Sequence, residues 1–378
     1  MKAIKKPKFI EVPFIGELAL SGVRPILGIA LGLLAGGVLI AVSGVNPFKA
    51  YKAMLQGAFG NRYAFSNVLV RSSPLLLGGI GVSLGIKAGV WNTGIEGYMY
   101  LGAVGAAVVG IPALGLPPVA HIILTLIVAM AFGAAWGLIP GYLRAYKGVN
   151  EVTSTIMLNY VAVFLTSWLV AEPQPLAEIG SFYPMSKLFQ ESAQLPILVR
   201  GTSLHPGAFI GLAVCVLLYF VLRYTPFGFR TRMLGFNPNA ARYAGVNTRK
   251  QIMLLIIIGA MLGGLAGAIE VTGLKRRVYM NFVTGVGYES VAVALLAGGN
   301  PLGVIAAALF FSALKAGGAT MSIQTNIGAP MTSVIIALCV IFVIGVGVSE
   351  RRRLGKVQDN EKSEAVNEPK IKEEENVT

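Results

Sequence analysis

Charged residues are scarce in this chain. Only 13% of its 378 residues are Asp, Glu, Lys or Arg, whereas soluble domains carry roughly 25%. The mean hydropathy of +0.70 over this length is too high for the single buried core of a water-soluble enzyme. The composition therefore predicts a polytopic membrane protein.

Cysteine and histidine are also rare, which argues against several kinds of site. Cys215 and Cys339 lie in apolar runs without CxxC spacing, so we expect small buried residues rather than ligands or disulfide partners. His121 and His205 are isolated, and we predict no metal site, no cofactor and no catalytic residue. The sequence has no G-x-x-x-x-G-K-[ST] loop for ATP phosphates. The net charge of +14 does not indicate nucleic acid, because Lys and Arg cluster beside apolar runs without a basic aromatic patch.

Long apolar runs recur along most of the chain, and a membrane-spanning helix needs about 20 such residues. We predict an all-α transmembrane bundle at residues 25–349, a cytoplasmic segment at 1–24 and a disordered cytoplasmic tail at 350–378. The ten expected spans are 25–45, 66–88, 93–111, 118–142, 151–170, 206–224, 251–271, 284–298, 301–317 and 329–348. An even number puts both termini on one side, and the distribution of Lys and Arg makes that side the cytoplasm.

Two places fit this topology less well. The eighth span is short and is followed by Asn300-Pro301, so the eighth and ninth spans are predicted to be half-helices or a re-entrant element. The basic stretch Leu274 to Tyr279 falls on the outer side. Either the seventh span is misplaced or this stretch serves a contact outside the cell. Lys315, at the end of the ninth span, is also expected outside.

Glycines recur at a spacing of four in three spans, which is typical of closely packed membrane helices. The three sets are Gly28, Gly32 and Gly36; Gly81, Gly85 and Gly89; and Gly259, Gly263 and Gly267. Helix packing is favoured over a direct role in transport. The stretch 85–98 also resembles 273–288, and the predicted topology puts the two at opposite sides. An inverted repeat, as in many transporters, and chance similarity both remain open.

Two polar stripes interrupt the apolar spans, and polar groups inside a membrane usually mark a path or a partner. Spacing of four places the members of each stripe on one helix face. The stripes are Asn92, Glu96 and Tyr100 in the third span, and Glu151, Thr155 and Asn159 in the fifth. They either line a translocation path or bond helices together, and the sequence alone does not decide between these roles.

A short basic helix is predicted in the central loop, Arg223 to Lys250. Asn237 suits the N-cap, Pro238 the first helical position and Gly245 the end. Ala240, Ala241 and Ala244 are expected to lie along one side, narrow enough to enter a groove on another protein. An ordinary positive loop is the alternative.

This loop resembles the cytoplasmic coupling loop of ABC-importer permeases of the ribose, nucleoside and branched-chain amino acid group. Its Gly-x-Asn-x-x-Ala-Ala-x-x-x-Gly pattern is matched by Gly235, Asn237, Ala240, Ala241 and Gly245. Three further blocks, Gly85 to Ala103, Gly148 to Ala162 and Gly285 to Gly318, resemble segments of the same family in the same order. The second of these, GVNEVTSTIMLNYVA, is similar to the nucleoside and simple-sugar branch.

The resemblance implies a permease without enzymatic activity, located in the cell membrane. Its expected partners are an ABC ATP-binding subunit inside, a substrate-binding protein outside, and a second permease subunit that is identical or related. The solute would be a nucleoside or a simple sugar. The long loop from Ala171 to His205 and the residues 275–277 are expected to contact the binding protein. An ion-coupled carrier acting alone and a membrane scaffold are the alternatives.

Overall fold

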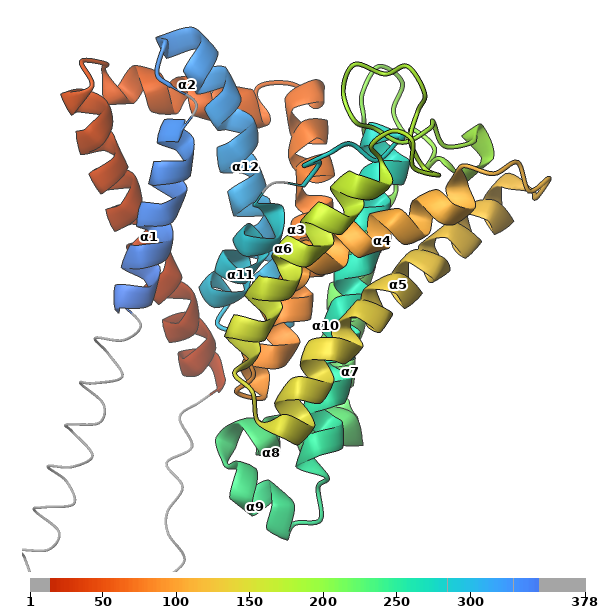
Figure 1. Ribbon diagram of the computed structural model, residues 1–378. Helices are drawn as coiled ribbons and strands as arrows, with labels where there is room; N and C mark the ends of the chain where they lie inside the picture. The colour runs from red at the N-terminus through yellow and green to blue at the C-terminus, as the bar shows by residue number, and fades with distance from the viewer. Residues whose placement is uncertain (1–13, 284, 329, 347–378) are drawn as a thin grey trace, which may run out of the picture. The chain divides into compact units, whose positions relative to one another are not determined.

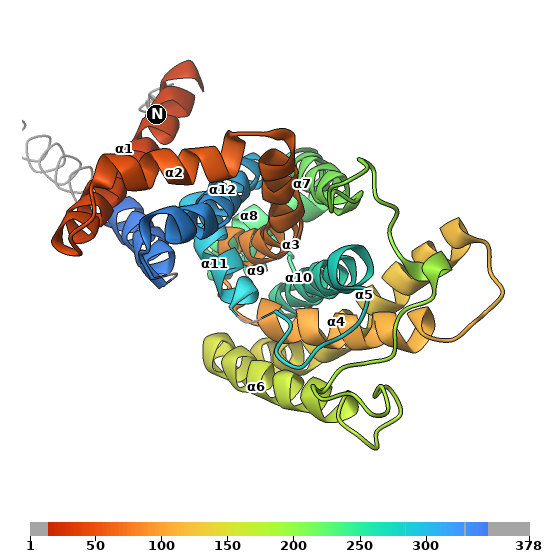
Figure 2. The same cartoon turned by 90° about the horizontal axis from the view of Figure 1, so that it is seen from above.

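The computed structural model describes residues 14–283, 285–328 and 330–346, and Figures 1 and 2 show two perpendicular views. The all-α prediction is confirmed over these ranges, where β-structure is limited to the isolated bridges Ala177–Ser186 and Met185–Tyr279. The predicted tail 350–378 lies outside the described residues. The chain divides into two compact units, one with residues on both sides of the other, Phe48–Ala329.

Helices make up most of both units. In chain order they are α1 (Phe14–Val42), α2 (Pro47–Phe59), α3 (Arg62–Lys87), α4 (Ile95–Gly110), α5 (Pro118–Lys147), α6 (Glu151–Leu169), the short η1 (Glu191–Ala193), α7 (Gly207–Tyr224), α8 (Pro226–Phe236), α9 (Pro238–Tyr243), α10 (Thr248–Ile269), η2 (Glu270–Lys275), α11 (Val286–Leu296), α12 (Pro301–Thr325) and a last helix, Pro330–Val346.

The smaller unit contains α1 and the helix Pro330–Val346, which pack through small residues. A Cβ atom at Gly28 would overlap the backbone of Val343, and one at Gly32 would overlap the backbone of Cys339. The backbones therefore approach more closely than larger side chains would permit. The predicted packing role of the first glycine set is confirmed at these two positions.

The larger unit is built around α3 and α10. Residues 72–85 of α3 are buried throughout, and α10 packs against α3, α4 and α5 (Figure 2). Glycine again permits the contact, since a Cβ at Gly267 would overlap the carbonyl of Met99 in α4. By contrast, α5, α6 and α7 expose large apolar side chains such as Ile127, Phe164 and Leu217. In a membrane protein such surfaces face lipid or another apolar partner.

Each of the ten predicted spans coincides with a helix, although not every helix is long enough to cross a membrane. Among the described residues six helices pass on length and apolarity, and the pair Ile26–Val42 and Pro47–Phe59 makes a seventh candidate. The helices Ile95–Gly110, Val286–Leu296 and Pro330–Val346 are apolar but shorter. The number of crossings stays a prediction.

Two helices were not expected from the sequence. In α2, Ala50, Ala53, Met54 and Ala58 are buried, and Gly317 of α12 lies against the Met54 carbonyl. Helix α8 has Thr225 as its N-cap and Pro226 in its first turn. Both segments carry Lys or Arg and fall below the apolar content of a span, so a search for membrane-length runs passes over them.

Candidate translocation pathway and coupling surface

The helical run of α3 and α4 is interrupted between Lys87 and Ile95. Gly89 has a φ of +72°, and the Val90 N–H returns to the Gly85 carbonyl at 2.9 Å, so the chain folds back along α3. Helix α4 then begins beside the middle of α3, where the side chain of Ile95 lies next to Gly78 and Gly81. Asn92 accepts hydrogen bonds from the Gly94 N–H and the Tyr98 hydroxyl, both at 3.1 Å. These bonds hold the first turn of α4.

A second non-helical segment precedes α11, and Glu96 connects the start of α4 to the start of α11. The Glu96 carboxylate accepts hydrogen bonds from the N–H groups of Gly285 at 2.8 Å and Gly287 at 2.6 Å. It therefore satisfies donors that the start of α11 leaves unpaired, at the end of the helix that favours negative charge. Glu96 is itself in the first turn of α4, so the N-termini of two short helices meet at this carboxylate.

The two short helices leave this meeting point in opposite directions. Helix α4 ends beside the 170–206 loop, where the Gly110 carbonyl accepts from the Gln190 N–H at 2.8 Å. Helix α11 ends near the end of α3, where Gly299 lies beside Ile86. The stretches 85–98 and 273–288 are thus the two interruptions that lead into α4 and α11. The predicted half-helix character fits α11, whereas α12 is a full-length helix; the inverted repeat stays a prediction.

The α6 stripe lies against the start of α4. Asn159 accepts from the Gly97 N–H at 2.9 Å and donates to the Thr93 carbonyl at 3.0 Å. The hydroxyl groups of Thr155 and Thr93 are 2.7 Å apart. Every one of these contacts joins α6 to the segment 88–97. Two of the three stripe positions of α6 therefore bond helices together.

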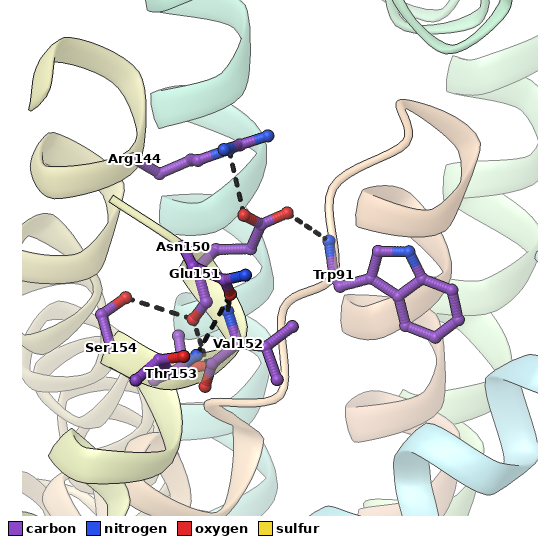
Figure 3. A network of polar contacts seen from close by, with 8 residues as sticks. Trp91, Arg144, Asn150, Glu151, Val152, Thr153 and Ser154 are labelled. Carbon is purple, nitrogen blue, oxygen red and sulfur yellow. Dashed lines mark hydrogen bonds and ion pairs between the residues drawn. The ribbon is translucent and has the colours of Figure 1, made fainter. Parts of the chain in front are cut away.

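Glu151 ties the same segment to α5. Its carboxylate accepts from the Trp91 N–H at 3.1 Å and pairs with the Arg144 guanidinium at 3.0 Å (Figure 3). Asn150 caps α6 by accepting from the N–H of Val152 at 2.9 Å (Figure 3). The cap fixes the first turn of α6, and with it the place of the Glu151 carboxylate.

All six stripe residues are between 1% and 5% exposed. Tyr100 lies deepest along the α4 stripe, with its ring edge-on to Phe282 at 4.9 Å between centroids. We name the five hydrogen-bonded residues Asn92, Glu96, Glu151, Thr155 and Asn159 the polar seam. Their contacts are those that the packing alternative requires, and a role of the six residues in the path stays a prediction.

The central loop forms the helix that its sequence indicates. Asn237 accepts from the N–H groups of Asn239 at 2.9 Å and Ala240 at 3.1 Å, and α9 follows from Pro238. Gly245 has a φ of +80°, a left-handed conformation that glycine adopts without strain. The cap, the proline and the terminating glycine are thus confirmed. In Figure 1, α8 and α9 lie at the end of the larger unit opposite the 170–206 loop.

The sequence suggested that Ala240, Ala241 and Ala244 lie along one free side of the helix. The structure shows that they do not. Ala240 and Ala244 are exposed, but Ala241 is fully buried. The sequence spacing was compatible with a common side, but Ala241 turns toward its own chain. The exposed surface instead includes the aromatic rings of Phe236 and Tyr243, which are 90% and 94% exposed. Gly235 fits against the Lys87 carbonyl at the end of α3, where a Cβ would overlap it.

A second group of charged side chains was missed or misplaced at the sequence level. Lys315 was expected outside the membrane, but α12 continues to Thr325 and places Lys315 within the helix. It pairs with Glu289 of α11 through two contacts of 2.7 Å. Arg71 lies within α3, and Glu270 in the π-helical turn η2. Single charges inside otherwise apolar helices were the signal that could have found them.

The 170–206 loop packs on the segment after η2. The N–H of Ser186 donates to the Val278 carbonyl at 2.8 Å, and the N–H of Phe189 donates to the Arg276 carbonyl at 3.0 Å. The π-helical turn extends the seventh predicted span to Lys275, so the basic stretch begins in the last residues of that helix and continues beyond it from Arg276. Two segments that the sequence proposed separately as outer contacts thus form one surface.

Comparison with known proteins identifies this architecture. Residues 64–344 match the family described as the permease component of the branched-chain amino acid transport system. The chain belongs to this family and is a membrane-embedded permease component of an ABC transport system, not an enzyme.

Three relatives each align with most of the chain. It is 35% identical to the guanosine ABC transporter permease NupP of Bacillus subtilis, over 84% of this chain and 92% of that protein. It is 32% identical to the glucose ABC transporter permease TsgB13 of Haloferax volcanii, over 90% of this chain and 92% of that protein. It is 30% identical to the nucleoside ABC transporter permease NupB of Lactococcus lactis, over 90% of this chain and 95% of that protein.

Proposed function

We propose that this permease imports nucleosides. The observation that carries the proposal is its similarity, over most of its length, to two permeases named for guanosine and nucleoside transport. The block 148–162, similar to the nucleoside and simple-sugar branch, supplies the α6 half of the polar seam. Simple sugars are the second candidate, because one relative is named for glucose.

The driving force in this proposal comes from a separate ATP-binding subunit. Membership of the family supports such a partner and an extracytoplasmic substrate-binding protein. A second permease subunit, identical or related, is part of the proposal. Helix α9 is the proposed site of coupling. In this proposal α9 and both termini of the chain lie on the cytoplasmic side of the membrane. A rigid, capped helix joined to α8 and α10 passes a rigid-body displacement to the bundle more directly than an unstructured loop would.

The end of the larger unit opposite α9, which carries the 170–206 loop, is proposed to bind the substrate-binding protein. The 170–206 loop exposes Ile179 and Phe182, and Arg276 lies beside it on the segment to which the loop is hydrogen-bonded. Reversal of charge at Arg276 and Arg277 is expected to weaken docking of the binding protein while leaving the ATP-binding subunit attached. Unchanged docking of both partners would count against this contact.

Uptake measurements test the substrate and the energy source together. Cells that express the whole importer are compared with cells that lack only the ATP-binding subunit, using labelled guanosine, uridine and glucose. The proposal expects nucleoside uptake in the first cells only. Preference for glucose would assign the sugar alternative, and uptake by the purified chain under an ion gradient without ATP would assign the ion-coupled carrier.

The exposed and buried alanines of α9 separate coupling from folding. Ala240→Trp adds bulk to the free side of the helix, so the permease should fold but lose the ATP-binding subunit on co-purification. Ala240→Ser is the matched control. Ala241→Trp should instead lower the yield of folded permease, because Ala241 is fully buried in its own chain. Normal co-purification by Ala240→Trp would contradict the proposed docking.

A further inference from the structure

Five charged side chains project from helices that pack together in the larger unit. Glu289 and Lys315 form an ion pair between α11 and α12, and their side chains keep 25% and 26% exposure. Glu270 and Lys275 lie 3.7 Å apart in η2, with 15% and 27% exposure. Arg71 of α3 is exposed. We name these five residues the charged cluster.

The five charges belong to one electrostatic group. The positive charges of Lys275, Arg71 and Lys315 interact electrostatically with the Glu270 carboxylate. The charges of Glu289 and Lys315 interact in the same way with the Glu96 carboxylate of the polar seam. Their elements are neighbours, since α3 packs against α11, α12 and η2, and α11 packs against α12 (Figures 1 and 2). Lys275 also lies 5.6 Å from the ring centroid of Phe282, which contacts Tyr100.

Two members of the cluster lie far from any helix end. At 1.5 Å per residue, Lys315 is about 15 Å from the end of α12 at Thr325, and Arg71 is about 14 Å from the start of α3 at Arg62. A hydrocarbon layer is about 30 Å thick. α3 and α12 have the length and apolarity of membrane spans, and a helix that crosses this layer carries a group at such a distance from its end inside the layer.

A charged group at this depth is stable only where water or a protein partner replaces lipid. Insertion of Arg, Lys or Asp at the centre of a membrane helix is unfavourable. Partial exposure shows that the charged cluster is not sealed among its own helices, unlike the polar seam. In a permease, water is expected to reach this depth along the path of the solute.

We propose that Arg71, Glu270, Lys275, Glu289 and Lys315 line the water-filled part of the translocation pathway. The proposal rests on the assignment of the chain as a permease and not on the identity of its solute. The cluster holds both signs of charge and offers hydrogen-bond donors and acceptors. This chemistry suits an uncharged solute with many hydroxyl, amino and carbonyl groups, and a nucleoside fits that description.

Reaction of single cysteines with a water-soluble thiosulfonate tests the location. The thiolate is the reactive form, and it is scarce where water is excluded. Arg71→Cys, Glu289→Cys and Lys315→Cys are prepared in the complete importer, after replacement of Cys215 and Cys339 by Ala. Ile127→Cys, on an exposed apolar face of α5, and Ala162→Cys, at a fully buried position, are the controls. Membranes open to reagent on both sides remove any dependence on orientation.

The three cluster positions are expected to react at least about tenfold faster than both controls. Labelling no faster than at Ile127 would overturn the proposal, since the cluster would then face lipid or a partner subunit. Gel filtration identifies any variant that fails to fold, and Arg71→Cys keeps the Glu289–Lys315 pair intact. Fast labelling in an importer that takes up no nucleoside would refute the substrate and leave the pathway in place.

Discussion

The polar seam and the charged cluster both place polar groups among apolar helices, but the seam is buried, whereas the cluster side chains stay partly exposed. Asn159 is 2% exposed, and its side chain bonds three groups on α4, α11 and the segment before α4. The Lys315 side chain is 26% exposed and bonds one carboxylate. Polar side chains thus bond helices together in the seam, whereas in the cluster they are proposed to meet the solute. Substitutions in the two regions should separate stability from transport.

The largest loss of stability is expected for Glu96→Ala. The N–H groups of Gly285 and Gly287 would lose their acceptor inside the bundle, at a cost of about 3 kcal/mol. Thermal unfolding of the purified permease in detergent measures the effect. Glu191→Ala, at an exposed position in η1, is the control and should change little. Equal stability of the two variants would show that the hydrogen bonds of Glu96 do not stabilise the fold.

Glu151→Ala is expected to cost somewhat less, about 2 kcal/mol, because Arg144 is partly exposed and water can replace its partner. The Trp91 N–H also loses its acceptor. Glu151→Gln keeps an oxygen for Trp91 and should recover part of the loss in the same unfolding measurement. A variant with Ala as stable as the variant with Gln would show that the Trp91 contact contributes nothing.

Asn159→Ala sharpens the comparison further. Loss of its bonds to Gly97 and Thr93 should lower stability by about 1.5 kcal/mol. Uptake per folded molecule should stay within about twofold of the unmodified importer, because a packing residue acts on the amount of folded protein. The measurement is nucleoside uptake divided by the amount of monodisperse permease. A strong fall in this ratio would show that Asn159 acts in the translocation path and not only in helix packing.

The smallest change in stability is expected for Glu289→Gln and Lys315→Gln. A partly exposed ion pair contributes up to about 1 kcal/mol. Uptake per folded molecule should nevertheless fall, because these groups are proposed to meet the solute. Lys187→Gln, at an exposed loop position, serves as the control for the loss of one charge. Full uptake by both cluster variants would show that Glu289 and Lys315 do not contact the solute in a way that transport requires.

Local signals in the sequence were sufficient for much of the fold. Long apolar runs predicted a helix at all ten expected places, and Asn237, Pro238 and Gly245 predicted α9 nearly to its ends. These features depend on neighbours within a few residues. The same logic failed for Ala241 and Lys315. The side of α9 that is free depends on the packing of the loop, and Lys315 was misplaced because α12 continues past the apolar run.

The sequence by itself determined that this protein is a helical membrane permease, which residues cap α9 and which polar residues form the two stripes in its apolar spans. Only the tertiary structure decided that the seam residues are sealed between helices, and only it brought together the charged cluster, whose side chains stay partly exposed. The physical reason is that helical spacing fixes the face on which a side chain lies, whereas burial depends on what covers that face. Here the segment 88–97 covers the polar side of α6, and the charged cluster keeps a partly open face.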